Sequence, residues 1–450
     1  MSQTKITKAQ TLEEALNVIN KDALSSSEVI DAFYVDTNKV RYVGATADPV
    51  KMMAIAIRTA KSPCHILFSG HIGCGKSTEL KRLEKMLTEQ KYLVSIAECH
   101  IRLNLNAMEY TDVMLFVLET LLDCAIMNDL AVNEKPLRRI QNYWGTELTK
   151  VSTAAFEATA GIHASIEAET PSLLKRIYKI VAGLRAELLI QSNTRAEFQQ
   201  KVQPELHTFI AMINEVISDI QNAGVKKGFK NTFPIILQDG LEKANMDVAD
   251  RLFERHSQDL VRMHAHLVMT FPINLCYKPG YVQIKNNFAN DWRLPMIKLR
   301  TWNGERYTEY PGGIKTLSDI VEKRMERDLF EGDTLKCMIV KTGGSLRDLF
   351  EVLYTAALNA LGEDRTIITQ QDAEAALNKM TSGISERFPQ NLIPKLIEII
   401  DGKKSYASDE DLMVLLQSSA VLEYNGERWV DVHPLAAEWI KNTQIAGKAF

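Results

Sequence analysis

A glycine-rich octapeptide, Gly70-His-Ile-Gly-Cys-Gly-Lys-Ser77, limits the folds open to this chain more than any other segment. It fits the pattern GxxxxGK[ST]. It follows a short apolar run, His65–Phe68, and it precedes apolar residues at helical spacing between Lys76 and Leu87. A buried strand, a glycine loop and a helix in this order make a phosphate-binding loop. The sequence therefore predicts a strand, a phosphate loop and a helix at residues 65–87.

Each residue type in the octapeptide has a physical role in holding phosphate. The glycines let successive backbone N–H groups curl around the phosphates, and the helix N-terminus adds partial positive charge. Lys76 would reach the outer phosphates, and Ser77 would ligate Mg²⁺. Cys74 is best explained as a small residue whose backbone binds the ligand. We expect ATP with Mg²⁺ at the loop residues Gly70, Gly73, Cys74, Gly75, Lys76, Ser77 and Thr78.

Composition narrows the class of protein. A length of 450 residues favours two or three domains, and 46% hydrophobic with 24% charged residues is typical of a globular protein. A net charge of −4 gives no overall attraction to nucleic acid or anionic lipid. The six cysteines lack metal-ligand spacing, and we expect reduced thiols and a cytoplasmic location. The most apolar window, 113–127, carries charges and predicts a buried helix, with no membrane span.

Short apolar runs elsewhere predict the rest of a sheet. We expect further strands at Tyr92–Ala97, Phe233–Leu237 and His266–Met269, and a short extended piece at Val40–Val43. Buried runs of this kind favour an α/β fold, with a parallel sheet covered by helices on both faces. The long stretch between the second and third strands, about 105–230, has mostly helical periodicity and is interpreted as a helical insertion.

The chain after the sheet predicts two further units. Residues 1–330 would form the nucleotide-binding domain, 331–385 a helical lid and 386–450 a winged-helix domain. In the last unit two helical runs precede Val421–Tyr424 and Arg428–Val430. These flank Asn425-Gly426, a strong signal for a two-residue hairpin turn. Helix, helix, hairpin and helix is a winged-helix pattern.

Two acidic residues follow the third predicted strand, in Phe233-Pro-Ile-Ile-Leu-Gln-Asp239-Gly-Leu-Glu242. A carboxylate at the end of a strand beside a phosphate loop suits Mg²⁺, so Asp239 is the expected metal residue together with Ser77. Glu242 could polarise the attacking water, although an acid just past a strand is often a helix cap.

These segments, with Leu267-Val-Met-Thr270-Phe-Pro272 and Gly343-Gly-Ser-Leu-Arg347-Asp, resemble the Walker A, Walker B, sensor 1 and sensor 2 motifs of AAA+ ATPases. Within that superfamily the chain most resembles the initiator and STAND branches. The resemblance implies that Thr270 senses the γ-phosphate and that Arg347 reaches the nucleotide from the lid. Gly240 stands where AAA+ proteins usually have a second acid, which argues against rapid turnover.

The same resemblance suggests roles for two more residues. Val430-Asp-Val-His433-Pro-Leu is similar to the winged-helix histidine motif of STAND proteins, in which the imidazole approaches bound ADP. Tyr42-Val-Gly44 resembles the AAA+ segment that packs on adenine. A core or capping histidine and a simple turn are the ordinary alternatives. Candidate arginine fingers are Arg255, Arg262 and Arg293, although an ordinary surface charge is the favoured interpretation of each.

Two functional hypotheses follow. The first is an ATP-hydrolysing AAA+/STAND-like switch whose nucleotide state controls self-assembly or partner binding through the insertion or the winged helix; a role in bacterial defence or signalling would fit the resemblance. The alternative is a DNA-binding ATPase regulator or loader of the initiator or transposition type, with Lys226, Lys227 and Lys230 as its best basic cluster. Residues 386–450 carry seven Lys/Arg against ten Asp/Glu, a balance of −3 that disfavours DNA binding there.

Overall fold

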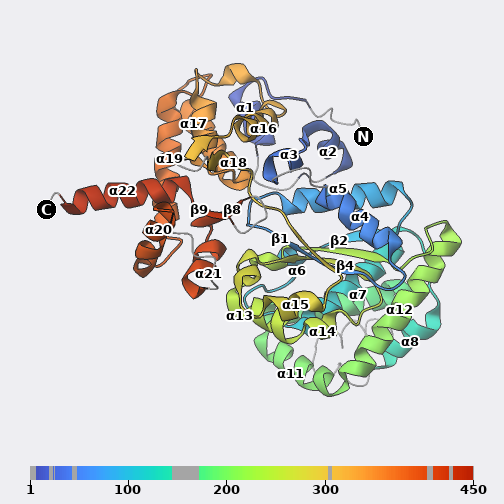
Figure 1. The fold of residues 1–450 in the computed structure, drawn as a ribbon. Helices are drawn as coiled ribbons and strands as arrows, with labels where there is room; N and C mark the ends of the chain where they lie inside the picture. The colour runs from blue at the N-terminus through green and yellow to red at the C-terminus, as the bar shows by residue number, and fades with distance from the viewer. Residues whose placement is uncertain are drawn as a thin grey trace.

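A five-stranded parallel sheet lies at the centre of the computed structural model, which describes residues 7–19, 24, 26–42, 48–143, 172–302, 307–402, 409–424 and 429–448. The strand order is β2-β3-β4-β1-β5 (Figure 1). The strands are β1 (His65–Ser69), β2 (Val94–Glu98), β3 (Ile235–Asp239), β4 (His266–Phe271) and β5 (Asn290–Arg293). The carboxyl ends of all five strands therefore meet at one edge of the sheet.

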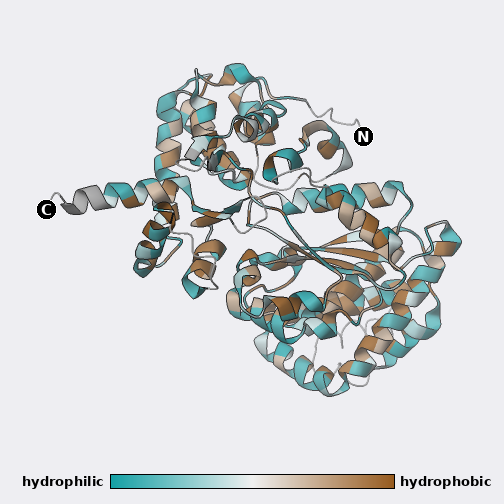
Figure 2. Ribbon diagram, in the orientation of Figure 1, coloured by the Kyte–Doolittle hydropathy of each residue, from teal (hydrophilic) through white to brown (hydrophobic). Residues whose placement is uncertain are grey.

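Helices cover both faces of the sheet, which explains why its inner strands are apolar on both sides. On one face, alternate residues such as Ile66 and Phe68 pack in one cluster with α4 (Pro49–Thr59) and α5 (Lys76–Glu89). On the other face, Leu67 belongs to the cluster that contains α7 (Tyr110–Met127). Figure 2 shows the resulting band of hydrophobic residues through the strands. This arrangement confirms the predicted P-loop NTPase sheet.

The long segment between β2 and β3 forms a helical layer around α7 (Figure 1). Its helices are α8 (Glu134–Tyr143), α10 (Leu173–Ile190), α11 (Ser192–Val202) and α12 (Leu206–Lys227). Two buried ion pairs attach it to α7. Arg185 donates to Glu119, and Arg195 lies 3.1 Å from Asp112. Asp112 also accepts from the Glu109 N–H in a capping box, which starts α7.

The helices after the sheet gather with the start of the chain into a second body (Figure 1). They are α16 (Pro311–Glu322), α17 (Thr334–Lys341), α18 (Leu346–Gly362) and α19 (Gln370–Ser385). Helix α1 (Leu12–Val18) packs on α18, and the backbone of Ala9 pairs with that of Met325. Helices α2 (Ser27–Phe33) and α3 (Asn38–Arg41) connect this body to α5 and the sheet.

The C-terminal part of the chain has two helices, a pair of strands and a last helix. These elements are α20 (Ile393–Ile400), α21 (Glu410–Gln417), β8 (Val421–Tyr424), β9 (Trp429–Val432) and α22 (Pro434–Lys448). The strands β8 and β9 are antiparallel, as the expected hairpin requires. The predicted turn at Asn425-Gly426 lies outside the described residues.

Shorter elements complete the connections near the sheet. They are α6 (Cys99–Arg102), α13 (Met246–Ala249), a π-helix (Asp250–Arg255), α14 (Ser257–Leu260), α15 (Tyr281–Asn286), β6 (Arg300–Trp302), β7 (Tyr307–Glu309) and short 3₁₀ turns, one of them at Ile273–Tyr277. No helix among the described residues is long and apolar enough to cross a bilayer.

One expectation about local structure was wrong in part, and one strand was missed. Of the extended piece expected at Val40–Val43, Tyr42 is extended, but Val40 and Arg41 belong to the short helix α3, where the Asn38 N–H donates to the Asp36 carboxylate at 2.9 Å. Val43 lies outside the described residues. Strand β5 was not predicted, because Asn290–Arg293 is polar and lies at the sheet edge, where one side needs no apolar cover.

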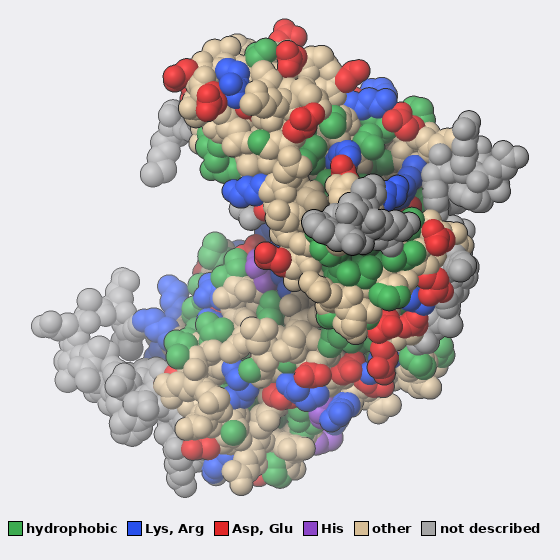
Figure 3. Space-filling model, turned by 90° about the vertical axis from the view of Figure 1, so that its left-hand side faces the viewer, with side chains coloured by type: hydrophobic (Ala, Val, Ile, Leu, Met, Phe, Trp, Pro, Cys, Tyr) green, Lys and Arg blue, Asp and Glu red, His purple; other side chains and the backbone are tan. Residues whose placement is uncertain are grey.

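Charge is mixed on the surface that Figure 3 shows, where Lys/Arg and Asp/Glu side chains are interspersed. The basic cluster predicted near β3 is partly neutralised, because the Lys227 ammonium lies 3.0 Å from the Asp129 carboxylate. Among the arginine-finger candidates, Arg293 is not a surface charge. Its side chain is mostly buried, with the guanidinium 3.4 Å from the Glu423 carboxylate.

The buried pair between α10 and α7 yields a stability prediction. Arg185→Met should lower the free energy of unfolding by about 3–5 kcal/mol, because it leaves the Glu119 carboxylate buried without its cation. The matched control is Arg138→Met, which breaks an exposed i,i+4 pair with Glu134 and should cost about 0.5 kcal/mol or less. Urea unfolding of the three proteins makes the comparison. Equal losses in both variants would contradict the prediction.

Candidate nucleotide-binding site

The loop between β1 and α5 has the backbone of a phosphate cradle. Gly73 and Gly75 have φ angles of +87° and +105°, a left-handed region in which a side chain would be strained. Gly75 is also the residue from which α5 starts, so the first N–H groups of that helix face the loop. The Lys76 ammonium is buried and donates to the carbonyls of Gly70 and His71, both at 2.8 Å.

The carboxyl end of β3 brings both predicted acids to the same loop. The Glu242 carboxylate lies 3.2 Å from the Lys76 ammonium, and Asp239 lines the same cavity as Ser77. Gly240 separates the two acids with a φ of +95°, and a Cβ atom there would lie 2.7 Å from the His100 ring. Position 240 therefore has no room for the second acid that AAA+ proteins usually carry.

Thr270, at the end of β4, contacts the segment that carries the two acidic residues. Its hydroxyl oxygen accepts from the Leu241 N–H at 2.9 Å, and the hydroxyl also interacts with the Glu242 carboxylate. Thr270 is fully buried and does not line the cavity in front of the loop. Its predicted contact with a γ-phosphate stays a prediction. What the structure gives it is a position directly behind Glu242.

Burial and neighbouring charges shift the pKa values of these groups in different directions. Burial tends to raise the pKa of Glu242, but the Lys76 ammonium and the Thr270 hydroxyl outweigh it, and the pKa lies below its ordinary value. The pKa of Asp239 is raised by burial and by the nearby Glu242 charge. Burial lowers the pKa of Lys76, yet Glu242 more than compensates and the pKa is raised. Glu242 is therefore ionised and able to accept a proton.

A cavity of about 400 Å³ opens in front of the loop. Eight residues predicted for the site line it: Gly73, Gly75, Lys76, Ser77, Thr78, Asp239, Glu242 and Arg347. Gly70 and Cys74 belong to the loop but do not line the cavity. The Cys74 side chain is buried in the hydrophobic cluster under α5, so only its backbone is available to a ligand.

Arg347 reaches the loop because the first turn of α18 packs on it. The backbone N–H groups of Leu346 and Arg347 donate to the Gly73 carbonyl, at 3.1 and 3.4 Å. A Cβ atom at Gly73 would lie 2.6 Å from the Arg347 Cβ, so only glycine allows this approach. The Ser345 side chain caps the helix by accepting from the Asp348 N–H. Gly73 and Arg347, which are far apart in the sequence, thus share one wall of the cavity.

Tyr42 and His433 lie away from the cavity wall. The Tyr42 hydroxyl donates to the Arg293 carbonyl at 2.5 Å, and Val43 and Gly44 of the predicted segment lie outside the described residues. His433 is fully buried, with its Nε2 3.4 Å from the Asp348 carboxylate on α18. It therefore touches the neighbour of Arg347 rather than the cavity. Contacts of Tyr42 and His433 with nucleotide stay predictions.

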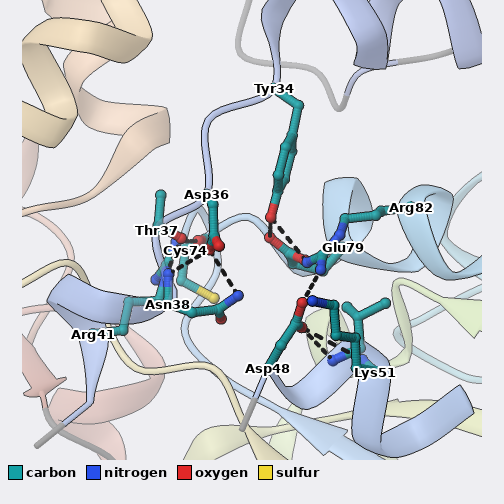
Figure 4. Close-up of polar contacts among 11 residues, drawn as sticks. Tyr34, Asp36, Thr37, Asn38, Arg41, Asp48, Lys51, Cys74, Glu79 and Arg82 are labelled. Carbon is teal, nitrogen blue, oxygen red and sulfur yellow. Dashed lines mark hydrogen bonds and ion pairs between the residues drawn. The ribbon is translucent and has the colours of Figure 1, made fainter. Parts of the chain in front are cut away.

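The N-terminal segment supplies a wall that sequence reasoning missed (Figure 4). The Tyr34 hydroxyl donates to Glu79 on α5 at 3.1 Å, and Arg82 donates to both the hydroxyl and Glu79. Burial raises the pKa of Glu79 to about 7. Arg41 is completely buried and donates to the carbonyl of Cys74 at 2.6 Å. These contacts fix the phosphate loop from the side opposite to β3.

The far end of the cavity is apolar, and it too was missed. Its wall includes Phe33, Val35, Ile320 and Phe350. Between the two rings lies Arg324, whose guanidinium carbon is 5.0 Å from each ring centroid. It donates to the Ile320 carbonyl at 2.7 Å, and burial lowers the pKa of Arg324 to about 10. Helical periodicity could have found Phe350, which is three positions beyond Arg347 and so on the same face of α18.

The residues at the loop fit a nucleoside triphosphate with Mg²⁺. Asp239 Oδ1 and Glu242 Oε2 are buried and have no hydrogen-bond partner, so both oxygens are available to a cation or to water. No cluster of three or more His, Cys, Asp or Glu in the described part of the chain could hold a metal alone. Mg²⁺ needs no such cage, because it is usually held by one or two protein groups together with the phosphates of the substrate. Ser77 and Asp239, which both line the cavity, would supply those groups.

Comparison with known proteins finds similarity in structure only. No family model matches the chain, and no curated protein does. A Walker-type ATPase of Pyrococcus abyssi is similar with a TM-score of 0.44 at 9% identity, covering 94% of this chain and 99% of the other. The ORC2 protein of Aeropyrum pernix gives 0.40 at 12%, covering 93% and 98%, and Cdc6p of Pyrobaculum aerophilum gives 0.37 at 11%, covering 93% and 98%. With TM-scores below 0.5, these similarities carry no conclusion about activity.

Proposed function

We propose that this chain binds ATP with Mg²⁺ at the phosphate loop and hydrolyses it, as an AAA+-type switch. One observation carries the proposal: the Lys76 ammonium, the Asp239 and Glu242 carboxylates and the Arg347 side chain meet at one cavity in front of a phosphate loop. Phosphoryl transfer needs little covalent chemistry from a protein, and mostly requires positioning and charge neutralisation. The cavity offers both.

The Glu242 and Asp239 carboxylates would have different roles in hydrolysis. Glu242 is ionised, and its Oε2 is unpartnered, so it can take a proton from an attacking water. Asp239 and Ser77 would hold Mg²⁺, which would neutralise charge on the phosphates. The Lys76 ammonium contacts two loop carbonyls and the Glu242 carboxylate. When nucleotide binds, it would exchange at least one of these contacts for an outer phosphate. In-line hydrolysis of the γ-phosphate is the reaction that these groups support.

The far end of the cavity suits a nucleobase. Phe33, Val35, Ile320 and Phe350 form an apolar wall beside the Arg324 guanidinium, and flat aromatic ligands bury well against such side chains. The wall is shared between the N-terminal segment and helices α16 and α18. A bound base would therefore touch two elements that the sequence separates widely.

The switch would work through α16–α19, acting as a lid, and through residues 386–450, interpreted as a winged helix. Arg347 on α18 lines the cavity, and His433 contacts Asp348 beside it. Nucleotide state would thus set the position of the lid and of the C-terminal unit, and that position would control self-assembly or binding of a protein partner. We assign the chain to the initiator/STAND type on this basis.

Lys76→Ala tests nucleotide binding. It should weaken the affinity for ATP by on the order of ten- to a hundredfold, because it removes the phosphate-facing cation. Titration of a fluorescent ATP analogue measures the affinity, and circular dichroism checks the fold. The matched control is Lys85→Ala on the same helix, whose ammonium pairs with Asp31 outside the cavity and which should bind normally. Unchanged affinity in a folded Lys76→Ala protein would remove the central claim.

Glu242→Gln separates binding from hydrolysis. An amide has the same shape but cannot accept the proton of the attacking water. ATP affinity should therefore persist while hydrolysis falls by about 10²–10⁴-fold. Phosphate release measures turnover. Glu89→Gln, on the exposed end of α5, is the control and should hydrolyse ATP at the wild-type rate. Full turnover by Glu242→Gln would place the base elsewhere.

Opposite effects of two variants test the switch. Arg347→Ala should reduce the ATP-dependent change in particle mass, because a ligand shifts an equilibrium only through contacts that differ between the states. His433→Ala should loosen the arrangement with Asp348 and raise assembly without ATP. The particle masses of both variants and of an Arg138→Ala control, at an exposed position outside the cavity, are measured in ADP and in ATP. If ADP and ATP give every protein the same mass, the switch is excluded.

A further inference from the structure

His71, the second residue of the phosphate loop, does not face the cavity. Its side chain is buried, with an exposed fraction of 1%, and its Nε2 accepts a hydrogen bond at 2.8 Å from the backbone N–H of Glu423 on β8. The residues that meet here are 352 positions apart in the chain. The phosphate loop is therefore attached directly to the C-terminal segment, residues 386–450.

The hydrogen bond at Nε2 also determines the protonation of the ring. Because Nε2 accepts, the neutral imidazole must carry its proton on Nδ1, a buried nitrogen that makes no hydrogen bond. Burial, followed by the positive charge of Lys76, lowers the pKa of His71 to about 3, so the ring is neutral at any physiological pH. The imidazole thus binds β8 as a neutral hydrogen-bond acceptor.

Glu423, which binds His71, is itself held by the nucleotide-binding part of the chain. Its carbonyl accepts from the Met296 N–H at 2.9 Å. Its carboxylate accepts from the Tyr277 hydroxyl at 2.6 Å and lies 3.4 Å from the Arg293 guanidinium. The side chain is fully buried, so these contacts are shielded from water. The His71 contact is one part of a rigid attachment rather than an isolated bond.

The same loop residue also binds the phosphate-facing lysine. The His71 carbonyl accepts from the Lys76 ammonium, whose other two contacts are the Gly70 carbonyl and Glu242. An ammonium has three donors, so a phosphate group can bind Lys76 only if one of these contacts is given up. Phosphate that binds Lys76 therefore acts on the backbone carbonyl of His71, whereas the C-terminal segment binds the imidazole of the same residue.

We propose that His71 is a positioning residue through which docking of the C-terminal segment determines how firmly the phosphate loop holds nucleotide. This inference rests on the proposed function, namely that nucleotide binds at Lys76. Coupling between two sites is reciprocal. Docked β8 stabilises the loop for nucleotide, and bound nucleotide stabilises the docking of β8 by the same factor.

Three substitutions separate the hydrogen bond from simple packing. Glutamine places an acceptor at the position of Nε2, whereas asparagine is one bond shorter and alanine has none. His71→Ala and His71→Asn should both release a fluorescent ADP analogue about tenfold faster, the loss expected for one buried hydrogen bond. His71→Gln should stay within about threefold of wild type. Stopped-flow displacement by unlabelled ADP measures the rates.

The outcomes are distinct. If wild type, His71→Asn and His71→Gln release ADP at one rate, the proposal is overturned, and it is equally overturned if glutamine and asparagine accelerate release alike. The Asn/Gln comparison remains decisive if His71→Ala does not fold. A Lys76→Ala protein that binds nucleotide normally would instead refute the proposed function, so the two failures can be told apart.

Amide hydrogen exchange gives a second test, because a role of His71 in packing alone would not make the exchange rate of the Glu423 amide depend on ADP. In wild type, ADP should slow exchange of the Glu423 amide, because that N–H donates to His71. In His71→Asn the amide should exchange about tenfold faster without ligand, and ADP should no longer slow it. His71→Gln should restore the effect of ADP. An equal effect of ADP in all three proteins would overturn the proposal.

Discussion

The three contacts of the buried Lys76 ammonium determine the geometry of the nucleotide-binding part of the molecule. Two are carbonyls of the loop itself, and the third is the Glu242 carboxylate beyond the end of β3. A buried ammonium is stable only when its donors are satisfied, so the loop, α5 and the end of β3 must stay close together. The glycines of the loop and Gly240 supply the backbone angles that permit this approach. The three contacts therefore hold the loop, α5 and the end of β3 in one arrangement.

Much of the fold could be predicted because its inner strands carry strong local signals. Strands β1, β3 and β4 are apolar and buried throughout, and each was found within a residue or two of its place. Edge strand β5 was missed because only tertiary pairing with β1 makes Asn290–Arg293 a strand. Residues 40–43 were expected to be extended, yet residues 38–41 form a helical turn from which Arg41 donates to the Cys74 carbonyl of the loop. This contact joins residues far apart in the sequence, so local preference did not reveal it.

The candidate site could be predicted on one side only. Motif spacing identified Lys76, Ser77 and Asp239, because a phosphate loop and a carboxylate at a strand end have fixed chemistry. The opposite wall consists of ordinary residues such as Phe33 and Arg324, and only folding brings them to the cavity. His71 is similar, because nothing in a glycine-rich motif tells that its imidazole turns away from phosphate toward β8. The motif specifies the residue types of the loop, but it does not specify which way the His71 side chain points.

The stacking of Arg324 between Phe33 and Phe350 determines which parts of the molecule can move independently. Its guanidinium contacts a ring from α2 and a ring from α18, and its own backbone carbonyl accepts from the Ala9 N–H. The beginning of the chain and α16–α18 are therefore fastened together at a buried point. The N-terminal segment is also fastened on its other side, because Tyr34 binds Glu79 on α5 and Arg41 binds the Cys74 carbonyl of the phosphate loop. Any movement of α16–α18 away from the sheet would therefore have to break one of these two sets of buried contacts.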